Sequence, residues 1–155
     1  MLEFEHIIQV NDPNDGSIPL LSRTQLWEGL MLRARRPDRF NDSLKVTNIE
    51  HAEDEFERII EVGEFEFHER VMLYPDERIH TQTMEEYEQL DAESVTELEE
   101  PEEGYLFVRF SYRRELENEE DVEEHLKAAY LQTDRDAITQ IRMLAASGLF
   151  GHATD

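Results

Sequence analysis

The first ten positions of the chain alternate between apolar and polar residues. Placed on an extended segment, the mostly apolar face would carry Leu2, Phe4, His6, Ile8 and Val10. Alternation of this kind is typical of a strand that buries one of its two faces. The pattern therefore predicts a half-buried strand over residues 2–10, which ends at the turn-forming residues 11–16 (NDPNDG).

A helix is predicted next, because Ser22 and Gln25 match the capping box, in which a hydroxyl and an amide satisfy free backbone N–H groups of the first turn. Apolar residues then recur at helical spacing, at Leu26, Trp27, Leu30, Met31 and Ala34. Pro37 ends this helix, since proline cannot donate a backbone hydrogen bond.

The clearest strand pattern covers residues 56–62 and 65–73, which are joined by Gly63 and Glu64. A two-residue loop with glycine first favours a type II′ hairpin turn. The loop also fixes the register, because a slip of one residue would turn every apolar side chain outward. The predicted pairs are Val62 with Phe65, Ile60 with Phe67, Arg58 with Glu69, and Phe56 with Val71.

Further strands are predicted at 44–51, 78–84, 94–99 and 105–112, with an acidic loop over 85–93. The inward face of 78–84 is left open, because the preceding turn could hold two or three residues. The last strand places Leu106, Val108, Phe110 and Tyr112 on one face. A long helix follows, capped by Asn118 and ended near Gly148, with a stripe that includes Leu126, Ala129, Tyr130, Thr133, Ala137 and Ile141.

This order of elements predicts one α+β domain over residues 1–155. We expect a curved sheet that grips the C-terminal helix, with a cavity between sheet and helix. A fold that encloses a cavity in this way usually binds a small molecule.

The chain is strongly acidic, with 38 Asp and Glu against 15 Lys and Arg and a formal net charge of −23. This charge repels phosphate backbones and anionic membranes, so no nucleic-acid or membrane binding is expected. Three explanations stay open: a salty cytoplasm, an ordinary acidic protein, or a basic partner. The chain has no cysteine, no apolar stretch near the roughly 20 residues of a membrane span, and an acidic first segment. We expect a cytoplasmic protein.

Arg58 and Glu69 are the most informative candidates, because each interrupts an apolar row and the register places them opposite each other. A buried charge without a partner costs several kcal/mol, so the pairing is physically reasonable. Three interpretations stay open: an ion pair within the sheet, a polar anchor for a ligand carboxylate, phenolate or carbonyl, or a different register in which the two side chains do not meet. Tyr112 and Tyr130 would orient a ligand oxygen or pack with one hydrogen bond each. The expected apolar walls are Phe56, Ile60, Phe67, Val108 and Phe110.

Catalytic and metal-binding motifs are weak. His6 lies on the apolar row of the first strand, where a hydrogen-bonded core histidine is a simpler interpretation than a general base. Glu3 with His6, and Glu77 with His80, are three residues apart on predicted strands and face opposite sides. We expect no metal site and no cofactor.

The layout and several local strings resemble the START/Bet v1-like superfamily, also called the polyketide cyclase-like or SRPBCC group, and within it the AtaL-like branch. The strings include residues 4–6 (FEH), 21–30 (LSRTQLWEGL), 99–101 (EEP) and 104–112 (GYLFVRFSY). The resemblance implies a helix-grip fold of about seven strands, two short helices near the first strand, and a cavity for a hydrophobic or aromatic molecule. It brings no catalytic residues. The glycine-rich loop of plant members is absent at residues 52–55 (AEDE).

Three functions follow as hypotheses. The first is binding of a small hydrophobic or aromatic ligand. The second is a cyclase, aromatase or hydrolase, in which Glu69 or His6 moves protons and Arg58 stabilises an enolate. The third is a protein-interaction module with an acidic surface. Whether a reaction is catalysed, which ligand is bound, and whether the chain is a monomer or a homodimer are left open.

Overall fold

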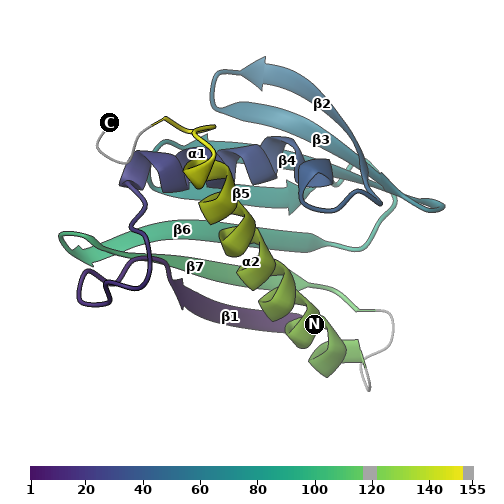
Figure 1. The fold of residues 1–155 in the computed structure, drawn as a ribbon. Coiled ribbons are helices and arrows are strands. Elements are labelled where there is room, and N and C mark those ends of the chain that lie inside the picture. The colour runs from purple at the N-terminus through teal and green to yellow at the C-terminus, as the bar shows by residue number, and fades with distance from the viewer. Residues whose placement is uncertain (117–121, 152–155) are drawn as a thin grey trace.

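The computed structural model describes residues 1–116 and 122–151, which form one seven-stranded antiparallel sheet and two α-helices. The elements are β1 (Leu2–Gln9), α1 (Arg23–Arg35), the 3-10 turn η1 (Pro37–Arg39), β2 (Lys45–Ala52), β3 (Glu55–Val62), β4 (Phe65–Tyr74), β5 (Arg78–Thr83), β6 (Ala92–Glu102), β7 (Tyr105–Arg114) and α2 (Val122–Ala146). The strand order is β1-β7-β6-β5-β4-β3-β2. Both helices lie on one side of the curved sheet, and α2 crosses it diagonally (Figure 1). The predicted α+β helix-grip architecture is confirmed.

The hairpin of β3 and β4 has the predicted register. Val62 pairs with Phe65, Ile60 with Phe67, Arg58 with Glu69, and Phe56 with Val71. Gly63 has a φ of 60°, and among the described non-glycine residues only Asp76 has a positive φ, so Glu64 does not. A positive φ at the first loop position alone agrees with the predicted type II′ turn.

Helix α1 begins with the predicted capping box. The backbone N–H of Gln25 donates to Ser22 Oγ (3.0 Å), and the backbone N–H of Ser22 donates to Gln25 Oε1 (3.0 Å). Gly29 lets α2 pack closely against α1, because a Cβ at this position would lie 2.5 Å from Ile141 Cγ2. After α1 the chain forms the short 3-10 helix η1, which agrees with the second short helix that the family resemblance implied.

Strands β6 and β7 are longer than the sequence predicted. β6 covers Ala92–Glu102 instead of 94–99, and β7 continues to Arg114. The two strands pair from Ala92 with Arg114 onward. The pairing is made by backbone hydrogen bonds, which do not require alternating side chains, so the sequence pattern does not mark these strand ends. Pro101 lies within the irregularity between Glu99 and Glu102, where a residue without an N–H is tolerated. The predicted cap at Asn118 lies outside the described residues.

The inward face of β5, which the sequence left open, carries Ile79, Thr81 and Thr83, and all three are buried. The hydrophobic core occupies part of the space between the sheet and both helices. Its fully buried side chains include Leu26, Phe56, Val71, Leu106, Val108, Phe110 and Ile141. Helix α2 contributes to this core only from Asp134 onward, because none of its first twelve residues, 122–133, is buried.

Candidate functional site

A buried carboxylate joins both helices to the sheet. Asp134 of α2 is 0% exposed. Its Oδ2 lies 2.7 Å from His6 Nε2 of β1, and its Oδ1 accepts a hydrogen bond from Arg33 Nη2 of α1 (2.8 Å). The Tyr112 hydroxyl of β7 lies 2.6 Å from Oδ2 and 2.8 Å from Oδ1. One side chain thus holds three separate elements of the fold together.

The positive charge of the Arg33 guanidinium offsets the negative charge of the Asp134 carboxylate. Burial raises the pKa of the Tyr112 phenol far above its usual value, and the nearby negative charge of Asp134 raises it further. Tyr112 therefore stays protonated, and its hydroxyl donates a hydrogen bond to the carboxylate. The His6 ring stacks with the rings of Phe4 and Phe110, with ring centroids 5.5 Å and 5.1 Å away. His6 is thus a hydrogen-bonded histidine that is also held by two aromatic contacts.

Next to this cluster, a cavity in two lobes lies on the helix side of the sheet. The larger lobe has a volume of ≈ 560 Å³ and reaches outward between β4 and the segment 84–91. The smaller lobe, of ≈ 340 Å³, extends beneath the first half of α2 toward α1. Each volume lies within the roughly 300–1,000 Å³ of typical ligand sites. The lobes share five residues, Thr81, Ser94, Tyr112, Arg114 and Tyr130.

Two stacked tyrosines and an arginine stand where the lobes meet. The rings of Tyr112 and Tyr130 are nearly parallel, with centroids 3.9 Å apart. Arg114 Nη1 donates to the Tyr130 hydroxyl at 3.4 Å, a long hydrogen bond. The cavity thus offers an aromatic surface, a phenol and a guanidinium at one point.

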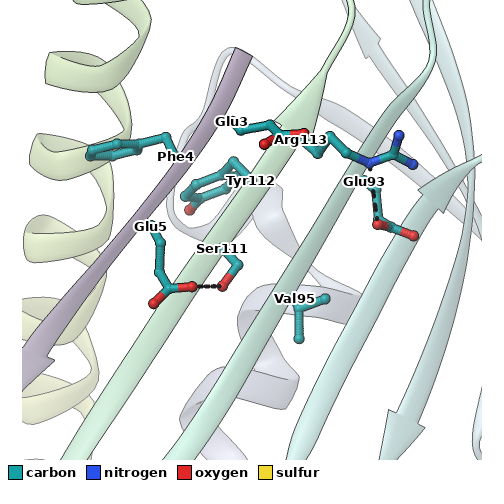
Figure 2. A pocket seen from close by; sticks show the side chains of 8 residues that line it. All are labelled: Glu3, Phe4, Glu5, Glu93, Val95, Ser111, Tyr112 and Arg113. Atoms are coloured by element: carbon teal, nitrogen blue, oxygen red, sulfur yellow. Dashed lines mark hydrogen bonds and ion pairs between the residues drawn. The ribbon is translucent and has the colours of Figure 1, made fainter. Parts of the chain in front are cut away.

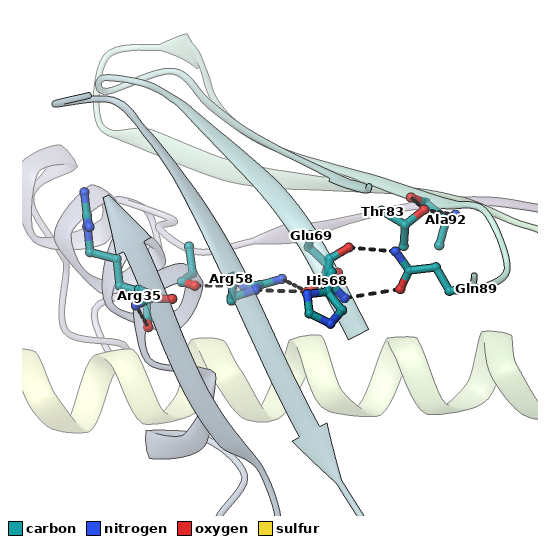
Figure 3. A network of polar contacts seen from close by, with 9 residues as sticks. Arg35, Arg58, His68, Glu69, Thr83, Gln89 and Ala92 are labelled. Carbon is teal, nitrogen blue, oxygen red and sulfur yellow. Dashed lines mark hydrogen bonds and ion pairs between the residues drawn. The ribbon is translucent and has the colours of Figure 1, made fainter. Parts of the chain in front are cut away.

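The Arg58–Glu69 pair is formed as the register predicted. Nε and Nη2 of Arg58 both donate to Glu69 Oε1 (3.0 and 2.9 Å), and Nη1 donates to the backbone carbonyl of Ala34 (2.7 Å). Figure 3 shows this chain of contacts from α1 through β3 to β4. All three guanidinium nitrogens are therefore engaged. Glu69 Oε2 accepts no hydrogen bond from any described residue, and Glu69 lines the larger lobe.

The segment 84–91 closes one side of the larger lobe. The Gln89 amide donates to the carbonyls of His68 (2.9 Å) and Met84 (3.0 Å) and accepts from the His68 N–H (3.2 Å), as a neighbouring strand would (Figure 3). The Tyr87 ring stacks on the His68 ring, with centroids 3.7 Å apart. Leu90 is 39% exposed and Phe65 is 69% exposed, so the mouth of the lobe has an apolar rim.

The candidate residues from the sequence separate into two groups. Those that line the cavity are Arg58, Glu69, Tyr112, Tyr130 and Phe67. Phe56, Val108 and Phe110 are 0% exposed and lie in the core. Ile60 pairs with Val46 and Phe67 and lines neither lobe.

Sequence reasoning missed three charged residues, Arg33, Arg114 and Asp134. Asp134 carried a detectable signal, because it follows Tyr130 by four residues and precedes Ile141 by seven, on the same helical stripe. Arg33 follows Leu30 by three residues on the buried face of α1. Arg114 continues the alternation of β7 two residues beyond Tyr112, where the strand was expected to end.

The outer face of the sheet carries a third hollow, of ≈ 390 Å³ (Figure 2). Ser111 donates to Glu5 (3.3 Å), and Arg113 lies 3.6 Å from Glu93. These polar groups are paired with one another, so the hollow offers little to a ligand. Within the described part of the chain, no three His, Asp or Glu residues are grouped so as to hold a metal ion. Neither described helix is long and apolar enough to cross a membrane.

Comparison with known proteins agrees with this architecture. The model of the AtaL family, described as "Acetylaranotin biosynthesis cluster protein L", matches residues 8–148. No curated protein matches the chain.

Similar solved structures share the fold at low sequence identity. The di-domain ARO/CYC StfQ from the steffimycin biosynthetic pathway is 11% identical, with a TM-score of 0.68 over 94% of this chain and 51% of StfQ, so this chain spans about half of StfQ. The Zhui aromatase/cyclase from Streptomyces sp. R1128 is 12% identical, with a TM-score of 0.62 over 95% and 94%. Truncated norcoclaurine synthase from Thalictrum flavum is 15% identical, with a TM-score of 0.62 over 90% and 91%. These likenesses show the Bet v1-like helix-grip fold.

Proposed function

The chain belongs to the AtaL family, and on that premise we propose that it binds a small hydrophobic or aromatic molecule in the cavity between the sheet and α2. The observation that carries this proposal is the two-lobed cavity, where Tyr112, Tyr130 and Arg114 converge. A ligand site usually combines apolar walls with a few polar groups that fix orientation. Here Phe67 and Leu90 supply apolar surface, and the residues at the junction supply the polar groups.

The cavity also separates this proposal from the third hypothesis, an interaction module with an acidic surface. A solid interior would favour a module that works through its outer surface alone. The smaller lobe instead reaches Arg58. We therefore propose that the function depends on the cavity and not on the outer surface alone.

Binding can be tested with the fluorescent probe 8-anilinonaphthalene-1-sulfonate and a variant that fills the cavity. Ser94 lines both lobes, so Ser94→Trp should occupy their junction and weaken probe binding at least about tenfold. The matched control is Val95→Trp, since Val95 is the next residue of β6 and lines the outer hollow. A fluorescence titration measures both variants. Unchanged binding by Ser94→Trp would contradict the proposal, and so would failure of the unaltered protein to bind both this probe and its neutral counterpart N-phenyl-1-naphthylamine.

A second candidate function is catalysis, and one observation favours it. Glu69 lines the larger lobe, and its Oε2 accepts no hydrogen bond from a described residue, while Arg58 holds Oε1. A carboxylate fixed in this way can accept a proton from a bound substrate. His6, the other candidate base, lines neither lobe and is bound to Asp134. The relatedness in fold to aromatase/cyclases adds support, and we propose Glu69 as the base of this second function.

The catalytic proposal predicts a separation of rate from binding. Protein purified from its own host is examined by native mass spectrometry for a bound compound, and turnover of that compound is followed chromatographically. Glu69→Gln should lower the rate by about 10²–10⁴-fold and leave binding almost unchanged, because the amide keeps the shape but cannot take the proton. Glu66→Gln is the control, since Glu66 lines the same lobe. Equal rates for Glu69→Gln and the unaltered protein would leave binding as the function.

A further inference from the structure

We infer that Arg114 selects ligands that carry an acidic group, such as a carboxylate, a phenolate or an enolate, at the junction of the two lobes. This inference deepens the proposed function and rests on it. It concerns a residue that the sequence did not single out.

The strand register carries Arg114 to the inner face. Arg114 is the last residue of β7 and lies between Leu2 of β1 and Ala92 of β6. It follows Phe110 and Tyr112 on the inner row, since side chains two apart share a face of a strand. The residue lines both lobes, so a ligand in either lobe would lie near it.

The guanidinium of Arg114 is incompletely satisfied. Its Nε is buried without a hydrogen-bond partner, and its one hydrogen bond to a described residue is the 3.4 Å contact with Tyr130. No described carboxylate forms an ion pair with it, whereas Arg33, Arg58 and Arg109 all pair with Asp or Glu. A buried donor left unpaired is costly, and a charged one more so. An anionic oxygen of a ligand would complete its coordination.

The charge of the protein makes this arginine more significant. A net charge of −23 repels an anion from most of the surface, so an anionic ligand needs a local cation to be held. Arg58 also lies at the smaller lobe, but its three nitrogens are already engaged. Arg33 and Arg113 also line a lobe, but Arg33 is paired with Asp134, and Arg113 with Asp91 and Glu93. Among the described residues, Arg114 is therefore the lobe-lining arginine that forms no ion pair with a described carboxylate.

The opposite side of the larger lobe indicates how such a ligand would be oriented. Glu69 of β4 presents a free carboxylate oxygen, which repels a second acid and accepts from a hydroxyl. β5 and β6 separate β4 from β7, which places their backbones roughly 14 Å apart. The preferred ligand is therefore an aromatic molecule with an acidic group at one end and a hydroxyl group at the other.

Two probes with the same aromatic skeleton test the inference. 8-Anilinonaphthalene-1-sulfonate carries a negative charge, and N-phenyl-1-naphthylamine is its neutral counterpart. Arg114→Met should weaken binding of the sulfonate about 10–100-fold and change binding of the neutral probe less than about threefold. Arg114→Lys should keep most of the affinity for the sulfonate, because the positive charge stays. Arg109→Met is the control, because Arg109 lies on the same strand as Arg114 but lines neither lobe. Its guanidinium pairs with Glu5 of β1 and Glu99 of β6.

The outcomes distinguish the inference from the proposed function. Circular dichroism and urea midpoints first establish that each variant is folded. Equal losses for both probes in Arg114→Met, or no loss for either, would overturn the inference while Ser94→Trp still reports on the cavity. Failure of both probes to bind the unaltered protein would overturn the proposed function, and the inference with it.

Discussion

Replacing Asp134 with alanine is expected to lower the free energy of unfolding by about 3–5 kcal/mol, the range for breaking a buried ion pair by removing one partner. The change leaves the Arg33 charge without its counterion and removes the acceptor for His6 and Tyr112. Domains have a total stability of only about 5–15 kcal/mol, so the variant should be close to the limit of folding. Urea denaturation followed by circular dichroism measures the effect.

Two further variants keep this prediction testable when the alanine variant does not fold. Asp134→Asn should cost less than alanine, because its amide oxygen still accepts a hydrogen bond. Asp136→Ala is the control, because Asp136 lies on the same helix and its bond from Gln132 is exposed, and we expect a change within about 0.5 kcal/mol. A loss below about 1 kcal/mol for Asp134→Ala would show that the cluster does not hold the fold together.

Phe56 and Phe67, on neighbouring strands, should differ when each is replaced by alanine: the first change should lower stability and the second should weaken ligand binding. Phe56 is 0% exposed, and the Arg35 guanidinium lies 4.6 Å from its ring centroid, so Phe56→Ala should destabilise the fold by about 3–5 kcal/mol. Phe67 is 37% exposed and lines the larger lobe, so Phe67→Ala should cost about 1 kcal/mol or less. Phe67→Ala should instead weaken binding of N-phenyl-1-naphthylamine about tenfold.

This comparison checks the division between core and cavity. Thermal unfolding and a fluorescence titration on both variants provide the two measurements. The division would be wrong if Phe56→Ala kept its stability and lost the probe, because Phe56 would then be a cavity wall. Equal losses of stability for the two variants would also contradict it, since Phe67 would then belong to the core.

The fold followed from the sequence where a local pattern had one physical solution. The Gly63–Glu64 loop permits one register, and that register is observed from Val62–Phe65 to Phe56–Val71. The capping box of Ser22 and Gln25 is formed. The ends of β6 could not be predicted, because that strand is held by backbone pairing to β7 and its side chains alternate only weakly.

The candidate site could be predicted from the sequence only in part, because the position of a cavity depends on how the elements pack in three dimensions. Alternation places Phe56, Phe67, Val108 and Phe110 on the inner face, but it does not show which of them helix α2 covers. The Arg58–Glu69 pair was predictable, since one hairpin contains both residues. The cluster around Asp134 was not, because it joins β1, α1, β7 and α2, which are far apart in the chain.

The division of α2 at Asp134 gives the two halves of the helix different freedom. Every buried residue of the helix lies at or after that carboxylate, whereas residues 122–133 rest on the smaller lobe through Leu126, Ala129, Tyr130 and Thr133. The early turns can tilt about this anchoring point without exposing the hydrophobic core. A ligand bulkier than the empty space would then be accommodated by displacement of the first turns of α2, while the hydrophobic core below Asp134 stays packed.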